Sequence, residues 1–325
     1  MTPIDWNVVD TMLSGVGIIC FAASSYAVAW ALELSRLMFR SRVRGLAMIG
    51  FAGAGLVAHT AFLYYLAVRE AGAPLSSERD WYLMAAWALV AIYLYLAVSR
   101  PKTPFGLFLL PLALALIGTA AFLAKSQPID RESASRVWGA MHGMALVLAA
   151  VAVVVGFVAG MMYLGKAWRL KHKRLPTGGL SLPSLEWLQW TNGRAIVVAV
   201  VMLGIGILSG MVLNRINIRD PSARLDWSDP VVISTWLMFF WLLAAVVFVA
   251  AHRPARQGRR VAYLTIAGFV FLVIVLAVGL LMDTKHWGRG KNDECRMMND
   301  ESRMPTSLIH HSSFIIHHSP GGPPC

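Results

Sequence analysis

Charged side chains are scarce in this sequence: Asp, Glu, Lys and Arg together make up only 14% of its 325 residues. A soluble domain carries about 25% charged residues, so this chain has too few polar groups to cover a water-facing globule. Hydrophobic residues make up 57% of it, and the mean hydropathy is +0.60. This balance excludes an ordinary soluble domain and predicts an integral membrane protein.

Clustered cysteines are also lacking, as is a basic stretch before the first apolar run. Cys20, Cys295 and Cys325 show no CxxC or other ligand spacing, so they indicate no cysteine-bound metal. The first apolar run is flanked by Asp5 and Asp10 rather than by basic residues, so we expect no cleavable signal peptide. The net charge of +12 fits cytoplasmic loops of a membrane protein better than a nucleic-acid surface, and we expect no nucleic-acid partner.

Apolar runs of about 20 residues mark membrane-spanning helices. We identify eight of them, which predicts an all-α integral membrane protein, a polytopic bundle of eight transmembrane helices. The runs are residues 11–33, 45–68, 81–99, 105–124, 138–164, 194–214, 231–251 and 261–282. The longest link, 165–193, contains "LPTGGLSLPSLEWLQW". Its Pro and Gly residues break helices, and its apolar residues predict a segment that lies on the membrane surface.

The distribution of basic residues predicts the orientation. Links after the first, third, fifth and seventh runs hold more Lys and Arg than the links between them. Basic loops face the cytoplasm, so both termini are expected to be extracytoplasmic, in a bacterial inner (cytoplasmic) membrane.

The last 38 residues differ from the rest. "NDECRMM" is followed at once by "NDESRMP", and "HHSSFIIHHS" repeats its own beginning. Such low-complexity sequence predicts a disordered, non-functional tail at 288–325, after a membrane domain at 1–287. Its histidines leave a metal-binding tract as an alternative.

Three histidines are predicted in the outer half of the membrane or at its outer surface. His142 lies one turn inside the start of the fifth run, His286 follows the eighth, and His59 lies inside the second. His142 and His286 can also be read as interfacial residues whose polar tips reach water. An ionisable residue as deep as His59 usually faces a cavity or the bundle interior, although an interhelical hydrogen bond is the simpler alternative.

The outer link before the seventh run carries Trp227 and Asp229 within "DWSDP". Taken alone, it fits an aromatic belt with solvated acids. Together with three histidines on the same side, it predicts a site for a flat, apolar, iron-bearing ligand such as haem, because imidazoles take axial positions and aromatic rings pack the face.

The order of these features resembles the cytochrome c assembly family, which includes CcsA, ResC, CcmC and shorter HemX-like proteins. The resemblance rests on "GLFLLPLAL", "YLGKAWRLKHKRLPTGGLSLPSLEWLQW", "GIGILSGMV", "DWSDPVVISTWL" and "VGLLMDTKHW", in this order. The family's Trp segment has more Trp and Gly before its Asp, and a Lys where this chain has Val231. The shorter segment points to the HemX-like branch.

The resemblance implies a haem site and a set of partners. His142 and His286 would be the axial ligands of haem b, Trp227 and Asp229 would form the intervening segment, and His59 would match a membrane-embedded histidine. The implied function is to bind haem and present it at the outer membrane surface for cytochrome c maturation. The implied partners are apocytochrome c and a ResB/CcsB-like membrane subunit, which would make the chain part of a cytochrome c haem lyase or synthase complex.

Three other functions stay open from the sequence. A HemX-like regulator of tetrapyrrole synthesis would share the same helices. An unrelated membrane transporter would fit the composition, but no half-to-half repeat is visible. A two-haem electron carrier would need histidines at two depths of the same helices, and no run contains two.

Overall fold

Regular structure in this protein is α-helical throughout the part that the computed structural model describes. The described residues are 6–35, 42–69, 77–100, 103–124, 133–172, 183–216, 227–251 and 258–281. The helices are α1 (Trp6–Ser35), α2 (Arg42–Arg69), α3 (Glu78–Ser99), α4 (Gly106–Phe122), α5 (Ser133–Lys171), α6 (Leu185–Ile216), α7 (Pro230–Ala251) and α8 (Gly258–Leu281). The predicted fold class, a polytopic helical membrane protein, is confirmed.

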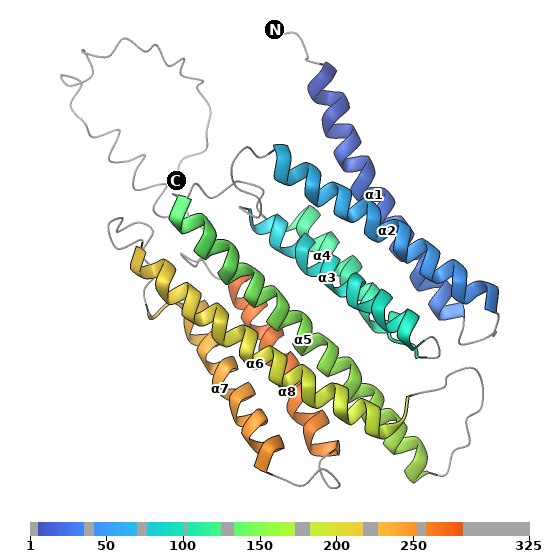
Figure 1. Ribbon diagram of the computed structural model, residues 1–325, viewed down its shortest axis with the longest axis vertical. Coiled ribbons are helices and arrows are strands. Elements are labelled where there is room, and N and C mark those ends of the chain that lie inside the picture. The colour runs from blue at the N-terminus through green and yellow to red at the C-terminus, as the bar shows by residue number, and fades with distance from the viewer. Residues whose placement is uncertain are drawn as a thin grey trace.

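Seven of the eight helices are long and apolar enough to cross a membrane. The exception is α4, which has 17 residues and contains Pro111. At 1.5 Å per residue it is about 25 Å long, slightly less than the ~30 Å hydrocarbon core. Figure 1 shows α3 and α5 starting at the same end of the bundle, so α4 must carry the chain back between them. Eight helices that alternate in this way place the start of α1 and the end of α8 on the same side.

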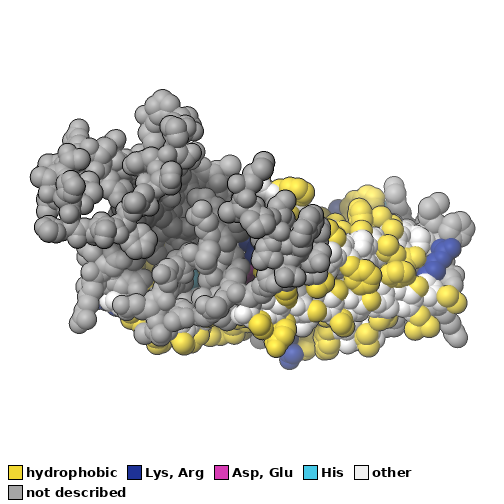
Figure 2. Space-filling view, turned by 90° about the horizontal axis from the view of Figure 1, so that it is seen from above, with side chains coloured by type: hydrophobic (Ala, Val, Ile, Leu, Met, Phe, Trp, Pro, Cys, Tyr) yellow, Lys and Arg dark blue, Asp and Glu magenta, His cyan; other side chains and the backbone are white. Residues whose placement is uncertain are grey.

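The sides of the helices are apolar. Figure 2 shows hydrophobic side chains spread over the described part of the visible face, with only a few basic side chains among them. Large exposed apolar residues occur on most helices, among them Phe21, Tyr64, Leu208 and Phe240. In water such a surface would be costly, whereas in a bilayer it faces lipid.

Neighbours in sequence are mostly neighbours in space. Contacts are densest between α5 and α6, followed by α1 with α2 and α3 with α4, and α3 also touches α5. Figure 1 shows α1–α4 on one side and α5–α8 on the other, and α3 and α5 lie where the two groups meet. The α3–α5 contact therefore joins the two halves of the bundle.

Small residues bring α5 close to its partners. A Cβ atom at Gly160 would lie 2.8 Å from the Thr265 hydroxyl oxygen and 3.4 Å from Cα of Ala262, both on α8. One turn earlier, a Cβ atom at Gly156 would lie 3.2 Å from Cβ of Ala195 on α6. Such close approach is how membrane helices gain packing energy, since lipid removes the hydrophobic drive between them.

Helices α5 and α6 are longer than the sequence predicted. α5 has 39 residues and α6 has 32. The prediction of a surface segment was wrong for residues 185–193, which form the first turns of α6. The predicted apolar run began only at residue 194, because polar residues precede it. The helix nevertheless starts at Leu185, where the Ser184 side chain accepts a hydrogen bond from the Trp187 amide.

Candidate functional site

His142 lies deeper along its helix than predicted. The sequence placed it one turn inside the helix, but α5 starts at Ser133, nine residues earlier. At 1.5 Å per residue, this distance is about 13 Å. The imidazole is half-buried.

A backbone carbonyl holds the His142 ring. Its Nδ1 lies 2.7 Å from the carbonyl oxygen of Gly206 on α6. A carbonyl oxygen only accepts hydrogen bonds, so Nδ1 carries the proton and donates it. In the neutral ring Nε2 then carries the lone pair, the form in which histidine binds metals.

The helix surfaces around His142 are bare of side chains at two points. A Cβ atom at Gly210 on α6 would lie 2.9 Å from both Cε1 and Nδ1 of His142. On the other side, a Cβ atom at Gly143 would collide with the indole of Trp81 from α3. Helices α3, α5 and α6 therefore meet around this histidine.

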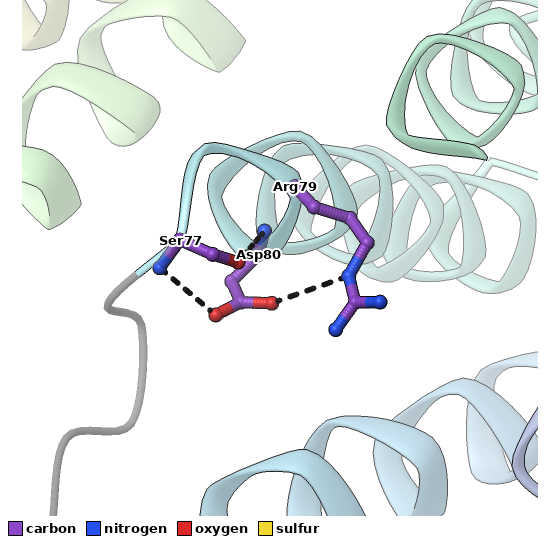
Figure 3. A network of polar contacts seen from close by, with 3 residues as sticks. All are labelled: Ser77, Arg79 and Asp80. Atoms are coloured by element: carbon purple, nitrogen blue, oxygen red, sulfur yellow. Dashed lines mark hydrogen bonds and ion pairs between the residues drawn. The ribbon is translucent and has the colours of Figure 1, made fainter. Parts of the chain in front are cut away.

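A polar cap fixes the start of α3 and with it Trp81. Figure 3 shows the Asp80 carboxylate between Ser77 and Arg79. Ser77 accepts a hydrogen bond from the Asp80 amide at 3.3 Å, and Asp80 accepts one from the Ser77 amide at 3.2 Å. Asp80 is 2% exposed, and Arg79 Nε lies 3.8 Å from its second oxygen. This capping box holds the first turn of α3, from which Trp81 packs on α5.

Asp229 and Trp227 lie at the start of α7. The Asp229 carboxylate accepts a hydrogen bond from the Val231 amide at 2.8 Å and is 7% exposed. It is thus the N-cap of α7, with Pro230 in the first helical position. Trp227, two residues earlier, is 57% exposed.

Among the predicted site residues that the structure describes, His59 is the most deeply buried. Its side chain is fully buried, and Nδ1 lies 3.3 Å from the hydroxyl oxygen of Tyr26 on α1. The Tyr26 ring packs against Gly55, one turn before His59 on α2. Nε2 of His59 has no hydrogen-bond partner among the described residues. Such an orphaned nitrogen inside a membrane bundle fits either a brace that satisfies one side only or a ligand-binding group.

The structure brings some of the predicted residues to one end and leaves others out. Figure 1 places the starts of α5 and α7 and the end of α6 at the same end of the bundle. Trp227 and Asp229 lie at the start of α7, and His142 lies nine residues after the start of α5. His286 and the tail at 288–325 lie outside the described residues. In the described part of the chain, no group of three or more His, Cys, Asp or Glu side chains is arranged to hold a metal ion.

Sequence reasoning missed the residues that hold the histidines. Gly206 is 64 residues from His142, and Tyr26 is 33 residues from His59. The sequence did carry a signal for Gly206, because "GIGILSG" places three glycines within seven residues of one helix. For Tyr26 and Trp81 the sequence offered none, since each is one aromatic residue among many.

Comparisons with known proteins bear on this arrangement. The family model described as "Cytochrome C assembly protein" matches residues 75–286, which include α3 to α8. No solved structure gives a significant match.

Several curated relatives bear the name "Cytochrome c biogenesis protein CcsA". The one from Synechococcus sp. (strain CC9902) is 26% identical over 239 residues, 64% of this chain and 75% of the relative. That from Synechococcus elongatus is 27% identical over 295 residues, 75% of this chain and 88% of the relative. That from Trieres chinensis is 24% identical over 321 residues, 87% of this chain and 98% of the relative.

Proposed function

Because the chain belongs to the cytochrome c assembly protein family and has a role in cytochrome c biogenesis, we propose that it binds haem b and presents it to apocytochrome c at the outer membrane surface. His142 and His286 are the proposed axial ligands of the iron. The observation that carries the proposal is the hydrogen bond from His142 Nδ1 to the Gly206 carbonyl.

That bond is what an axial histidine needs. Iron-binding imidazoles commonly donate their other N–H to a carbonyl or carboxylate, which fixes the tautomer and the plane of the ring. Gly206 does this for His142 from within a helix, so the acceptor is rigid. The residues present therefore fit one axial position, and His286 supplies the second in the proposal.

Trp227 and Asp229 support the remaining parts of the site. The half-exposed indole of Trp227, just before the start of α7, provides an apolar face against which a porphyrin would pack. Asp229 orders this segment by capping α7 and is not proposed as an iron ligand. Arg215, in the last turn of α6, is a candidate for the haem carboxylates, as are Arg136 and Arg224, whose side chains lie outside those described.

The chemistry divides between the cofactor and the chain. Haem supplies the vinyl groups to which the cysteine thiols of the client add. The chain's residues bind, orient and shield: His142 fixes a ligand direction, Trp227 offers an apolar face, and the arginines neutralise carboxylates. His59 is proposed as a second, transient site inside the bundle.

The setting of this function is also proposed. A bacterial cytoplasmic membrane with both termini outside agrees with the basic loops after α1, α3, α5 and α7. The described helices include no large outer domain of their own, so a ResB/CcsB-like subunit is proposed to supply contacts with the apocytochrome.

A regulatory role in tetrapyrrole synthesis is the second candidate. The observation that favours it is the short segment before Asp229, where Trp227 is the sole Trp between residues 217 and 229. Both functions need a haem or tetrapyrrole site, so they are separated by the client and not by the ligand.

The test is the visible spectrum of the purified full-length chain and its variants. Wild type is expected to show six-coordinate haem, and His142→Ala and His286→Ala should each lose that signature, with partial recovery on adding imidazole. His172→Ala is the matched control, because His172 also donates to a backbone carbonyl but lies at the opposite end of α5. Retention of the wild-type spectrum and full haem content by both variants would refute the paired-ligand site.

A further inference from the structure

Helix α6 presents a strip of bare backbone to His142. Gly206 and Gly210 are one turn apart on the same face, and both approach α5. A Cβ atom at Gly210 would lie 2.9 Å from Nδ1 and Cε1 of the imidazole. A Cβ atom at Gly206 would lie 2.7 Å from the Leu146 side chain, one turn after His142. A side chain at position 210 would therefore press on the imidazole itself, whereas one at position 206 would press on the Leu146 side chain.

The Ser209 hydroxyl can donate to the same Gly206 carbonyl that accepts the hydrogen bond from His142. The Ser209 hydroxyl lies 2.9 Å from the Gly206 oxygen and 2.8 Å from the Ile205 oxygen, so its single proton has two acceptors within reach. Ser209 is 2% exposed, which leaves water little access to compete. A carbonyl oxygen has two lone pairs. The Gly206 oxygen lies inside α6, where it already accepts a backbone hydrogen bond of the helix. When Ser209 donates to Gly206, it competes with His142.

We propose that residues 206–210 form a seat that positions His142 and tunes it as a ligand. In this seat Gly210 sets the place of the ring, Gly206 sets its tautomer, and Ser209 sets the strength of the Nδ1–H bond. The ligand that Nε2 binds rests on the proposed function, whereas the placing of the ring does not. Ser209 and Gly210 are thus positioning residues, because they act through His142.

The tuning follows from how an imidazole donates electrons. A stronger hydrogen bond from Nδ1 makes the ring more basic and a better donor through Nε2. A better donor stabilises ferric iron over ferrous and lowers the reduction potential of a haem. Ser209 weakens the Nδ1–H bond by occupying the same oxygen, so it raises that potential.

The placing of the ring is tested in the full chain purified without haem. Histidine labelled with nitrogen-15 reports which ring nitrogen carries the proton. Wild-type His142, assigned by its loss in His142→Ala, should show the Nδ1–H form, and Gly210→Ala should shift its signals and mix the tautomers. Gly193→Ala is the matched control, since Gly193 lies on the same helix and a Cβ atom there would meet nothing within 4 Å among the described residues. Unchanged His142 signals in Gly210→Ala would overturn the seat.

The tuning is tested by adding haemin to the same proteins. Gly210→Ala should bind haemin about 10–100-fold more weakly, the usual loss for a ligand whose supporting contact is removed. Ser209→Ala should bring the reduction potential below the wild-type value, and Ser209→Cys, with its weaker donor, should fall between them. An unchanged potential in Ser209→Ala would overturn the tuning role. If wild type binds no haemin while the nitrogen-15 result holds, the proposed function fails and the seat stands.

Discussion

Replacing Gly55 by alanine tests how Tyr26 reaches His59. The Tyr26 ring lies on the bare backbone of α2 at Gly55, and its hydroxyl meets His59 one turn further along. A Cβ atom at residue 55 would lie 2.6 Å from Cε1 and 2.8 Å from Cδ1 of Tyr26. The buried ring has no solvent to move into, so it must shift together with α1.

The size of the effect follows from three terms. Alanine is intrinsically better than glycine in a helix by about 1 kcal/mol, which favours the variant. Overpacking a close contact costs about 1–3 kcal/mol. Losing the Tyr26–His59 hydrogen bond costs about 0.6 kcal/mol on average for membrane helices, and it leaves Nδ1 of His59 without a partner in addition to Nε2.

A control on the same helix removes the first term. A Cβ atom at Gly53 would meet none of the described residues within 4 Å, so Gly53→Ala gains the helix propensity without the clash. We expect the free energy of unfolding of Gly55→Ala to be about 1–3 kcal/mol lower than that of Gly53→Ala. The measurement is reversible unfolding of the detergent-solubilised protein, with Tyr26→Phe as a third variant that removes the hydroxyl and keeps the ring. Equal stability of the two alanine variants would show that the packing of Tyr26 on α2 is wrong.

Four further outcomes are expected. Asp229→Ala should lower the free energy of unfolding by about 1 kcal/mol while Asp229→Asn stays near wild type, because asparagine also caps helices; thermal unfolding decides. His59→Ala should reduce haem loading without abolishing the fold, and equal loading and stability would leave His59 a bystander. A reporter fused after Arg174 should be cytoplasmic, and an extracytoplasmic signal would reverse the orientation. Truncation after residue 287 should leave membrane insertion and haem content unchanged, and a loss of folding would make the tail structural.

The helices could be predicted from the sequence, but the positions of their ends were predicted less well. Runs of apolar residues suffice to locate spanning helices, since the bilayer demands both length and internal hydrogen bonds. Hydropathy does not register where a helix continues into polar sequence, which is why α5 gained Ser133 at its start and α6 gained Leu185. The extension of α5 places His142 two and a half turns inside the helix instead of one turn.

The site was predictable as residue types and not as contacts. A histidine at the head of an oily helix is conspicuous, so His142 could be singled out. Its acceptor is a backbone atom of a glycine 64 residues away, and no side-chain chemistry marks it. Likewise, Asp229 could be noted as an acid beside Trp227, but its capping of α7 depends on local geometry that many Asp-Pro pairs do not adopt. Pairing across helices is set by packing, which one sequence does not reveal.

The lengths of α5 and α6 make the tilt of these two helices depend on the thickness of the bilayer. With 39 residues, α5 is about 58 Å long, nearly twice the ~30 Å hydrocarbon core. It packs tightly along α6, so the two behave as one stiff rod that meets a thinner or thicker membrane by tilting. A tilt about the midplane moves the two ends of such a rod in opposite senses. The depth of His142 is thereby coupled mechanically to the basic end of α5, about 29 residues or ~44 Å away.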